Sequence, residues 1–424
     1  MNPTPAPAYT THPDDRDILR GLAEQLAVIA ALPVQKEKAE LWGRLNDLRS
    51  ERPMVWITEI PWHEFSADTP ELVLRCRADW TRKLEVELRR TLYSWKHFPV
   101  DMIVNDYLPC YTTWRSTGFG ITRQGDLLNI TNGGIVSQHF EPQITRLEDV
   151  AKIKDPVVTV DRADTAARLA AMQDIFAGVM PVREEGVKLY WYSAWDQLVT
   201  FYGVQEALTD LIEQPELVHA TVKRLVAAYM KELDQLEAEG LLMLNSTNVR
   251  TGSGAYGYCS TLPAPGQENG KVRTQQMWGC SNAQIFTEVS PGMHWEFALQ
   301  HDLPFLARWG LVYYGCCEAL DQKMEILRRV PNLRKVSMNY RINPERAAAA
   351  VGGDYAFSYK PNPACFAIDA WCPDKARTEL RRIRECMRGG HVEFVMKDIS
   401  TVAGRPDRLA EWGKIAMEEA ERAG

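Results

Sequence analysis

Short apolar runs alternate with long amphipathic segments over most of this chain, and that alternation restricts the fold more than any other feature. Eight runs are expected to be strands: Met54–Thr58, Val100–Val104, Lys188–Tyr192, Leu241–Leu244, Leu311–Tyr314, Lys335–Met338, Tyr355–Ser358 and Val392–Met396. The intervals between them carry apolar residues at helical spacing. Strands interleaved with helices predict an α/β fold with a parallel sheet, and the count predicts a (β/α)8 TIM barrel. A doubly wound open sheet is the alternative, but its Gly-x-Gly-x-x-Gly turn is absent.

The predicted barrel domain spans residues 51–424, and residues 1–50 precede it as a separate extension. That extension begins as a Pro-rich tail and continues as two amphipathic helices, which are expected to form a cap or a dimerisation arm, so a homodimer is expected. Two segments, 108–145 and 248–282, are too long for plain connections and are interpreted as loops over the barrel mouth. The Gly-rich stretch Thr251–Gly257 is interpreted as a flexible part of the second loop.

Composition excludes several classes of protein. The 424 residues carry a net charge of −7, which argues against a nucleic-acid-binding protein. No apolar run reaches the roughly 18 residues of a membrane span, and the N-terminus lacks the pattern of a secretory signal. Nine cysteines without a disulfide-framework spacing favour reduced thiols. We therefore expect a cytoplasmic protein.

In a barrel of this kind, functional side chains lie just beyond the carboxyl ends of the strands. The predicted substrate-binding residues at those positions are Trp62, His63, Asn105, Trp191, Trp195, Asn245 and Asn339. The set is rich in aromatics and amides and poor in clustered base, which predicts a pocket for a flat or apolar substrate rather than a phosphate. The aromatic residues could equally be barrel packing.

Two adjacent thiols follow the strand at 311–314. Cys316 and Cys317 stand directly before Glu318, a combination that favours a metal site or a nucleophile over inert packing. Cys365 lies two strands later and could complete a thiolate site for Zn²⁺ across the mouth. His-Glu-x-x-His and Gly-x-Ser-x-Gly are both absent, which excludes the common zinc-protease and serine-hydrolase patterns.

Three segments resemble the uroporphyrinogen decarboxylase superfamily. They are residues 144–156, residues 278–286 (Trp-Gly-Cys-Ser-Asn-Ala-Gln-Ile-Phe) and the strand end at 313–318 (Tyr-Tyr-Gly-Cys-Cys-Glu). The resemblance covers roughly residues 50–424 and implies a (β/α)8 barrel with its site at the strand carboxyl ends. It also implies one of two activities: uroporphyrinogen decarboxylation, or methyl transfer to or from a cobalamin carried on a partner protein.

The decarboxylases of this superfamily carry Arg-Gln-Ala-Gly-Arg at the first strand to hold carboxylates. The matching stretch here, residues 56–63, has no arginine, and Glu59 would repel a polyanionic substrate. The methyltransferases carry His-x-Cys and a later cysteine that hold Zn²⁺. Here Cys316 keeps the cysteine, while Tyr314 replaces the histidine, so the resemblance implies a rearranged metal set of Cys316, Cys317, Glu318 and Cys365.

The leading hypothesis is therefore a methyltransferase that moves a methyl group from a small-molecule donor, an aromatic methyl ether, to a corrinoid. The chain has no Asp-x-His-x-x-Gly motif of its own, so cobalamin would arrive free or on a corrinoid carrier protein. The departing oxygen needs a Lewis acid such as zinc, or a proton from Glu59, Tyr107 or Asp398. The alternatives are a lyase with Arg250, Arg273 and Arg341 as carboxylate clamps, and a non-catalytic corrinoid- or ligand-binding protein.

Overall fold

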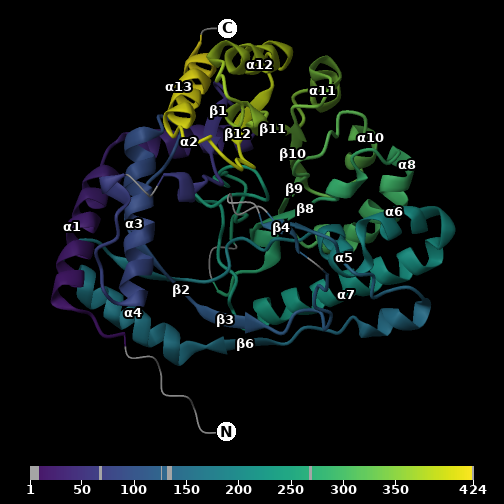
Figure 1. The fold of residues 1–424 in the computed structure, drawn as a ribbon, viewed down its shortest axis with the longest axis horizontal. Coiled ribbons are helices and arrows are strands. Elements are labelled where there is room, and N and C mark those ends of the chain that lie inside the picture. The colour runs from purple at the N-terminus through teal and green to yellow at the C-terminus, as the bar shows by residue number, and fades with distance from the viewer. Residues whose placement is uncertain (1–8, 66–68, 126, 131–135, 267–269, 423–424) are drawn as a thin grey trace.

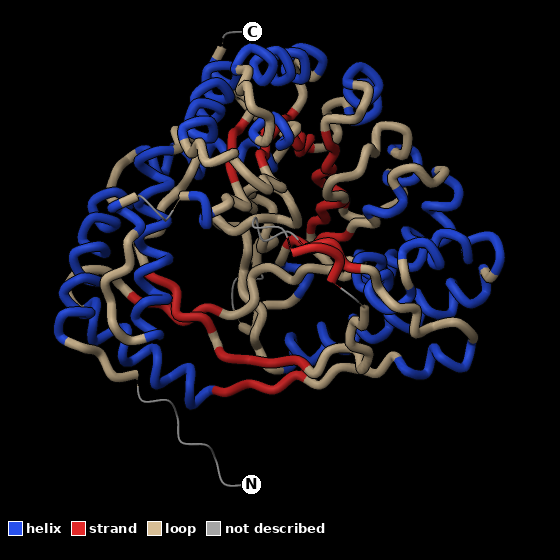
Figure 2. The backbone as a smooth tube through the Cα atoms, in the orientation of Figure 1, coloured by secondary structure: helices blue, strands red, loops and turns tan. Residues whose placement is uncertain are grey.

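A parallel sheet of six strands forms the centre of the molecule. The computed structural model describes residues 9–65, 69–125, 127–130, 136–266 and 270–422. Every pair of neighbours in the sheet is parallel, in the order β1-β12-β11-β10-β9-β8. These strands are β1 (Met54–Ile57), β8 (Trp278–Ser281), β9 (Leu311–Tyr314), β10 (Leu333–Asn339), β11 (Ala356–Lys360) and β12 (His391–Met396). Figure 2 shows them as an arc with helices outside it.

Helices follow most of the strands, as expected for a chain that alternates between the two elements (Figure 1). Their bounds are α1 (Pro13–Ala30), α2 (Val34–Asn46), α3 (Asp79–His97), α4 (Arg162–Phe176), α5 (Ala194–Tyr202), α6 (Val204–Glu213), α7 (Pro215–Ala238), α8 (Pro291–His294), α9 (Gln300–Leu306), α10 (Met324–Leu327), α11 (Pro344–Val351), α12 (Pro373–Cys386) and α13 (Asp407–Glu421). None of the helices in the described residues is long and apolar enough to cross a membrane.

The structure confirms a parallel α/β architecture, but within the described residues the sheet does not close into an eight-stranded barrel. Three predicted strands, at 100–104, 188–192 and 241–244, run without a regular ladder, and a single bridge joins Val187 to Leu242. Conversely, residues 278–281 form the edge strand β8, although the sequence analysis placed them in the second mouth loop. Glycine is required inside that strand, because a Cβ at Gly279 would lie 2.2 Å from Cγ of Trp309.

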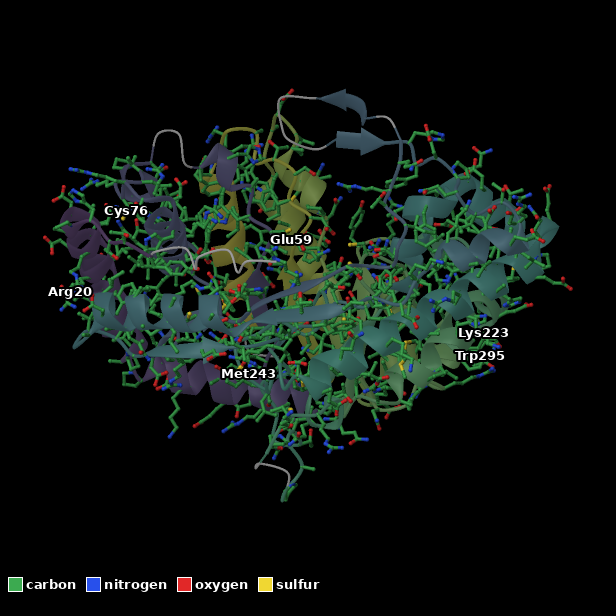
Figure 3. The ribbon with its side chains drawn as sticks, turned by 90° about the horizontal axis from the view of Figure 1, so that it is seen from below. Arg20, Glu59, Cys76, Lys223, Met243 and Trp295 are labelled. Carbon is green, nitrogen blue, oxygen red and sulfur yellow. The ribbon has the colours of Figure 1, made fainter. Side chains whose placement is uncertain are left out.

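The long segment after residue 108 does leave the sheet, as its length predicts. β2 (Leu108–Tyr111) pairs in parallel with β7 (Val182–Glu185), and β3 (Thr113–Ser116) pairs antiparallel with β6 (Val158–Asp161). β4 (Leu127–Ile130) and β5 (Val136–Gln138) form an antiparallel hairpin that stands out from one face of the molecule (Figure 3). The glycines at 133 and 134 lie outside the described residues.

The Gly-rich stretch 251–257 is not the flexible mouth loop that its composition predicts. All seven residues are buried, and the loop folds back on itself through a bridge between Arg250 and Tyr256. A Cβ at Gly252 would lie 2.4 Å from Cδ1 of Tyr313, and Gly252 has a φ of +53°. The glycines therefore allow the backbone to pack against the Tyr313 ring on β9, where a larger residue would not fit.

The two N-terminal helices form as predicted and pack onto the rest of the chain. α1 lies against α3 and α4, while α2 lies against β1 and β12. The Trp42 indole on α2 donates to the Asp101 carbonyl at 2.9 Å, and Asn46 donates to the Tyr256 carbonyl at 2.8 Å. These two bonds attach α2 to Asp101 and to the Gly-rich stretch 251–257. The expected Pro-rich tail, residues 1–8, lies outside the described residues.

Candidate functional site

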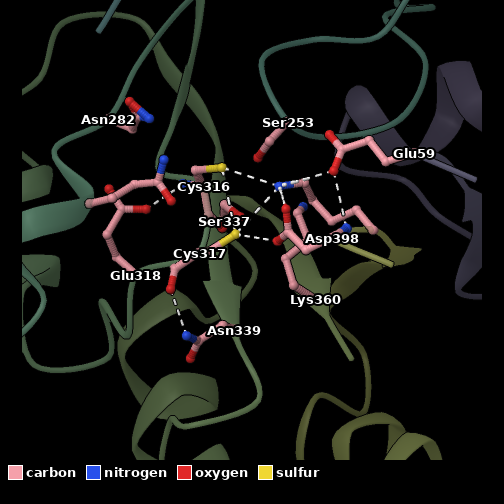
Figure 4. A network of polar contacts seen from close by, with 12 residues as sticks. Glu59, Ser253, Asn282, Cys316, Cys317, Glu318, Ser337, Asn339, Lys360 and Asp398 are labelled. Atoms are coloured by element: carbon pink, nitrogen blue, oxygen red, sulfur yellow. Dashed lines mark hydrogen bonds and ion pairs between the residues drawn. The ribbon is translucent and has the colours of Figure 1, made fainter. Parts of the chain in front are cut away.

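Five side chains meet beyond the carboxyl ends of three strands of the sheet. Glu59 follows β1, Cys316 and Cys317 follow β9, and Lys397 and Asp398 follow β12. We call these five residues the thiol cluster. Figure 4 shows the two sulfurs and the Glu59 and Asp398 carboxylates around a common centre. Figure 3 places Glu59 in the middle of the molecule, away from Cys76 and Arg20 at one end and Trp295 at the other.

The turn that carries the two thiols is fixed by its neighbours. Gly315 has a φ of +99°, and a Cβ there would lie 2.8 Å from Cδ1 of Leu320, so glycine is required where the chain leaves β9. Ser337 donates to the Cys316 carbonyl at 2.7 Å, and Asn339 donates to the Cys317 carbonyl at 2.6 Å. The predicted substrate-binding residue Asn339 therefore positions Cys317 through its backbone.

Lys397 lies between the sulfurs and the carboxylates. Its Nζ is 3.4 Å from Sγ of Cys316 and 3.4 Å from Sγ of Cys317. The same nitrogen is 2.8 Å from Oδ1 of Asp398 and 3.8 Å from Oε2 of Glu59. The side chain is only 5% exposed, so the ammonium group depends on these partners for compensation.

The two thiols lie side by side and differ in accessibility. Their sulfurs are 3.7 Å apart, and the Cys317 sulfur is also 2.6 Å from Oδ2 of Asp398. A hydrogen bond from Cys317, assisted by Lys397, holds the pKa of Cys316 below its usual value. The same bond raises the pKa of Cys317 well above its usual value. Cys316 is buried, whereas Cys317 is partly exposed, so the thiol with the lowered pKa is the covered one.

Lys397 and Asp398 are both held in their charged forms. Burial acts to lower the pKa of Lys397, but the two sulfurs and the carboxylates more than offset burial and raise it. Burial acts to raise the pKa of Asp398, but Lys397 and the hydrogen bond from Cys317 bring it below its usual value. A carboxylate at Asp398 disfavours the proton-donor role that the sequence predicted for it.

Backbone strain marks the same place. Glu59 and Asp398 both have positive φ, at +55° and +57°, on neighbouring strand ends. A left-handed conformation costs a non-glycine residue roughly 1–2 kcal/mol, and such residues concentrate at functional sites. The Asp398 amide donates to Oε2 of Glu59 at 3.0 Å, so the two strained residues hold each other.

An aromatic ring and an arginine border the cluster. Nη1 of Arg250 is 3.5 Å from Oε1 of Glu59, and the guanidinium lies 5.8 Å from the centre of the Trp191 ring. Trp191 is 38% exposed, so part of its ring remains accessible beside Arg250. The structure thus places the predicted residue Trp191 beside the cluster.

A buried layer of charge lies beneath the cluster. Lys335 on β10 and Glu393 on β12 form an ion pair at 2.7 Å with both side chains fully buried. Ser358 donates to Oε1 of Glu393 at 2.5 Å, and Lys360 donates to Ser358 at 2.5 Å and to the Tyr313 hydroxyl at 3.0 Å. Burial, followed by repulsion from Lys397, lowers the pKa of Lys360 to about 8.

The four predicted metal ligands do not come together. Glu318 is fully buried, and its carboxylate accepts from the Cys316 amide at 2.5 Å and the Ala283 amide at 2.9 Å, so it caps the turn instead of facing the sulfurs. Cys365 lies near Glu379 and Arg408, and burial raises its pKa to about 12. Among the described residues, no group of three or more His, Cys, Asp or Glu is arranged to hold a metal.

Zinc does not fit the two remaining sulfurs as they stand. A Zn²⁺ ion would lie about 2.3 Å from each thiolate. The Lys397 ammonium already lies within 3.4 Å of both, so the two cations would compete for the same position. Lys397 neutralises the charge that a metal would otherwise neutralise.

A separate group of predicted residues borders a cavity of about 880 Å³ between α1, α3, α4 and residues 102–114. Asn105 and Tyr107 line it, and none of its lining residues belongs to the thiol cluster. The Tyr107 hydroxyl donates to Glu185 and lies 3.1 Å from Nζ of Lys188. Burial and Glu185 raise the pKa of Tyr107. The predicted catalytic residue Tyr107 is thus held away from Glu59 and Asp398.

Four other predicted residues have structural or peripheral places. Trp195 is fully buried and donates to the Phe297 carbonyl at 3.0 Å. Asn245 is 1% exposed and bonds the backbone of Lys188 and Trp278, in place of a strand ladder. Trp62 packs against Phe65 and Tyr93, and the exposed His63 lies 3.7 Å from Glu64. The prediction that Trp195 and Asn245 contact the substrate is therefore corrected, because both side chains are buried and bond to the backbone.

Lys397 and Asp196 stand beyond predicted strands but were assigned no role, and Arg250 was expected only in the lyase alternative, as a carboxylate clamp. Lys397 was visible as the residue before Asp398 at a strand end, but only the fold shows that it reaches both sulfurs. Asp196 accepts from Asn282 and Gln284 at 3.2 Å each, and burial raises its pKa. Asn282 is 2% exposed, and its Oδ1 has no hydrogen-bond partner, so this corner holds a buried acceptor that is not satisfied by the protein.

Comparisons with known proteins add little to this geometry. No protein-family model and no curated protein matches the chain. Among solved structures, a methyltransferase from Methanosarcina mazei is similar with a TM-score of 0.49 and 12% sequence identity, covering 90% of this chain and 97% of that one. A likeness at this level carries no argument about activity, which has to be drawn from the site itself.

Proposed function

We propose that the protein is a methyltransferase that takes a methyl group from a small donor, expected to be an aromatic methyl ether, and passes it to a corrinoid on a separate carrier protein. The observation that carries the proposal is the thiol pair beside Lys397 at the end of β9. It stands where the sequence resembles the His-x-Cys segment of corrinoid-linked methyltransferases. The corrinoid enters as a second substrate, and the cytoplasm is the expected compartment.

The surrounding groups have complementary tasks in this proposal. The exposed face of Trp191 would stack on an aromatic donor, with the Arg250 guanidinium over the same ring. The departing oxygen is a poor leaving group unless it is protonated or leaves as a phenolate. Asp196, whose pKa burial raises, is better suited to donate that proton than Asp398, whose pKa is lowered.

The lyase alternative finds less support at the site. Of the three arginines that could clamp substrate carboxylates, Arg250 is paired with Glu59. Arg273 caps a short helical turn at residues 274–276, and Arg341 lies over Tyr340. Among the residues that the structure describes, the cations at the thiol cluster are already paired, since Lys397 lies against Asp398 and Glu59.

The test is methyl transfer to cob(I)alamin. Purified protein is incubated with cob(I)alamin and a panel of methoxylated aromatics, methylamines and methanol, and formation of methylcobalamin is followed by absorbance. We expect turnover with at least one methoxylated aromatic, and a loss of about a hundredfold or more in Cys317→Ser. Cys365→Ser is the matched control and should keep the wild-type rate. Carbon dioxide release from uroporphyrinogen, with no methyl transfer to cobalamin, would instead establish the lyase.

A further inference from the structure

The cavity of about 880 Å³ lies apart from the thiol cluster and is walled partly by the N-terminal extension. Tyr9, just before α1, lines it together with side chains of α1, α3 and α4. The Tyr9 hydroxyl donates to Oδ1 of Asp164 at 2.6 Å, and the Trp80 indole donates to the Thr10 carbonyl at 2.9 Å. These bonds fix the extension as one wall of a cavity whose volume suits a small organic ligand.

The walls of the cavity are apolar and aromatic. Aromatic rings line it, among them Tyr9, Trp80 and Trp114. A methionine side chain adapts to the shape of its neighbour and makes favourable contacts with aromatic rings. The walls therefore favour a flat apolar molecule, in particular an aromatic one. The buried apolar side chains among the lining residues are Leu26, Leu88, Met102, Met172, Phe176 and Met180.

The charges that border the cavity balance one another. Within the described chain, the charged residues that line it are Lys83, Glu87 and Arg168. Lys83 and Glu87 have opposite signs, and both are exposed on α3. The Arg168 guanidinium donates to Oγ1 of Thr113 at 2.9 Å and lies 3.5 Å from Oδ2 of Asp164. A further charge inside the apolar walls would lack compensation, so the cavity favours an uncharged molecule.

Two side-chain amides supply the polar contact that the walls lack. Asn105 and Asn248 both line the cavity, and both are half-buried. Nδ2 of Asn248 lies 3.5 Å from the Ile103 carbonyl, which places this amide beside the backbone that leads to Asn105. Within the described part of the chain, the Asn105 side chain makes no hydrogen bond to the protein. Its Oδ1 is therefore available to accept a hydrogen bond from a bound molecule.

We propose that this cavity is a second ligand site, which binds a planar, uncharged aromatic amine or phenol between its apolar walls and holds the N–H or O–H group of that molecule on Oδ1 of Asn105. The site is separate from methyl transfer, since none of the lining residues belongs to the thiol cluster. Burial of the ring supplies the affinity, and the hydrogen bond to the amide selects ligands that carry a donor group.

The test uses 1-aminoanthracene, a planar, uncharged aromatic amine whose fluorescence rises in apolar surroundings. Titration of the full chain should show saturable binding of a single probe molecule. Thr91→Trp adds an indole to the cavity from α3 and should weaken binding about tenfold or more, because the ring occupies the space of the ligand. Thr209→Trp, the same exchange at an exposed position of α6, is the matched control and should keep the affinity within about twofold.

A second set of measurements isolates the hydrogen bond to Asn105. In methylanthracene, a methyl group replaces the amino group at the same position, and its affinity is measured by displacement of the fluorescent probe. Asn105→Ala should weaken the amine by about three- to tenfold and leave methylanthracene within about twofold, as expected for the loss of one neutral hydrogen bond. The carboxylate of the same ring system should bind wild-type protein about tenfold more weakly than the amine.

The outcomes decide each part of the inference. Unchanged affinity in Thr91→Trp, an equal loss in Thr209→Trp, or binding of many probe molecules per chain would overturn the site. An equal loss of both compounds in Asn105→Ala would overturn the hydrogen bond, and tighter binding of the carboxylate would overturn the ligand class. The Asn105 measurements stand alone should Thr91→Trp fail to fold, which thermal melting reveals.

This inference and the proposed function can fail separately. Cys317→Ser should bind the probe as wild-type protein does, because the thiol cluster contributes nothing to the cavity. Selective probe binding without methyl transfer to cob(I)alamin would leave the second site in place and remove the proposed function. Methyl transfer in a protein that binds no probe would do the reverse.

Discussion

The molecule has a regular half and an irregular half, and they treat their functional residues differently. In the regular half, from β8 to β1, six parallel strands end at one edge of the sheet and bring Glu59, Cys316, Cys317, Lys397 and Asp398 together. In the irregular half, residues 100–258, helices α4 to α7 are joined by loops and two-stranded pairings, and the three predicted strands form no regular ladder. There, Tyr107 and Asn105 line a cavity of their own, and Asn245 replaces a ladder with side-chain bonds.

The difference shows how paired strands position the side chains of a functional site. A parallel ladder fixes register, so that side chains beyond several strand ends face the same space. Where the ladder is missing, a position beyond a predicted strand has no fixed relation to its neighbours. The predictions below test whether stability and activity follow the same division, beginning with the largest expected effect.

Removing one member of the buried ion pair in the regular half should cost the most stability. Lys335→Met leaves the Glu393 carboxylate fully buried beside Ser358 and Lys360, and we expect a loss of about 3–5 kcal/mol in the free energy of unfolding, measured in urea. The double variant Lys335→Met/Glu393→Gln should recover at least half. Lys188→Met, which breaks a less buried lysine–glutamate pair in the irregular half, should cost less. Equal losses would contradict the comparison.

The contact between the halves should make stability depend on pH. Asp302 on α9 accepts from Tyr192 at 2.6 Å and from Ser281 on β8 at 2.7 Å, and burial raises its pKa from 3.8 to about 7. The folded state therefore holds this proton up to about pH 7, while the unfolded state loses it near pH 4, so stability falls as pH rises between those values.

The matched variant is Asp302→Asn, which can keep both hydrogen bonds without titrating. Relative to wild type, its free energy of unfolding should increase by about 2.5 kcal/mol between pH 5 and pH 8, because other titrations cancel in the difference. Urea unfolding at the two pH values measures it. A difference that stays constant with pH would show that Asp302 has an ordinary pKa.

Within the irregular half, the side-chain amide of Asn245 should contribute more to the free energy of unfolding than an average surface side chain. Asn245→Ala leaves the Trp278 amide and the carbonyls of Lys188 and Trp278 without partners, at a cost of about 2 kcal/mol. Asn105→Ala, on the wall of the cavity, is the matched control and should stay within about 0.5 kcal/mol of wild type. A small loss of stability at both positions would mean that the Asn245 side chain does not replace the backbone hydrogen bonds of a strand ladder.

The smallest effect is expected at the cavity. Tyr107→Phe removes a hydroxyl that donates to Glu185 but lies outside the thiol cluster, so the rate of methyl transfer should stay within about twofold of wild type. Steady-state assays with the best donor measure this. A loss of more than tenfold would place the substrate in the cavity and reverse the roles of the two halves.

The sequence was sufficient for the parts that depend on local pattern. Buried apolar runs gave β1 and β9 to β12, and helical spacing gave α1 and α2. Sequence-based prediction failed where contacts between distant residues determine the local structure. Gly279 resembled loop sequence, yet it is the residue that allows β8 to pass the Trp309 ring. Gly252 resembled a flexible loop, yet it is pressed against Tyr313.

The candidate site divided in the same way. Glu59, Cys316, Cys317 and Asp398 could be placed from strand ends alone, because each follows a strand that forms. Their chemistry could not be predicted in this way. Whether a metal ion fits between the thiols depends on the position of the Lys397 ammonium group, which only the fold shows. Glu318 was misjudged for a similar reason: its carboxylate satisfies backbone amides, a requirement that no sequence spacing reveals.

The Gly-rich stretch 251–257 against Tyr313 has a practical consequence for redesign. Its residues are all buried, and a Cβ at Gly252 would lie 2.4 Å from Cδ1 of Tyr313, so this stretch tolerates little change. Libraries restricted to Trp191, Arg250 and Asp196 could change which donors are accepted while the scaffold keeps its melting behaviour. Randomising residues 251–257 instead should destabilise the fold.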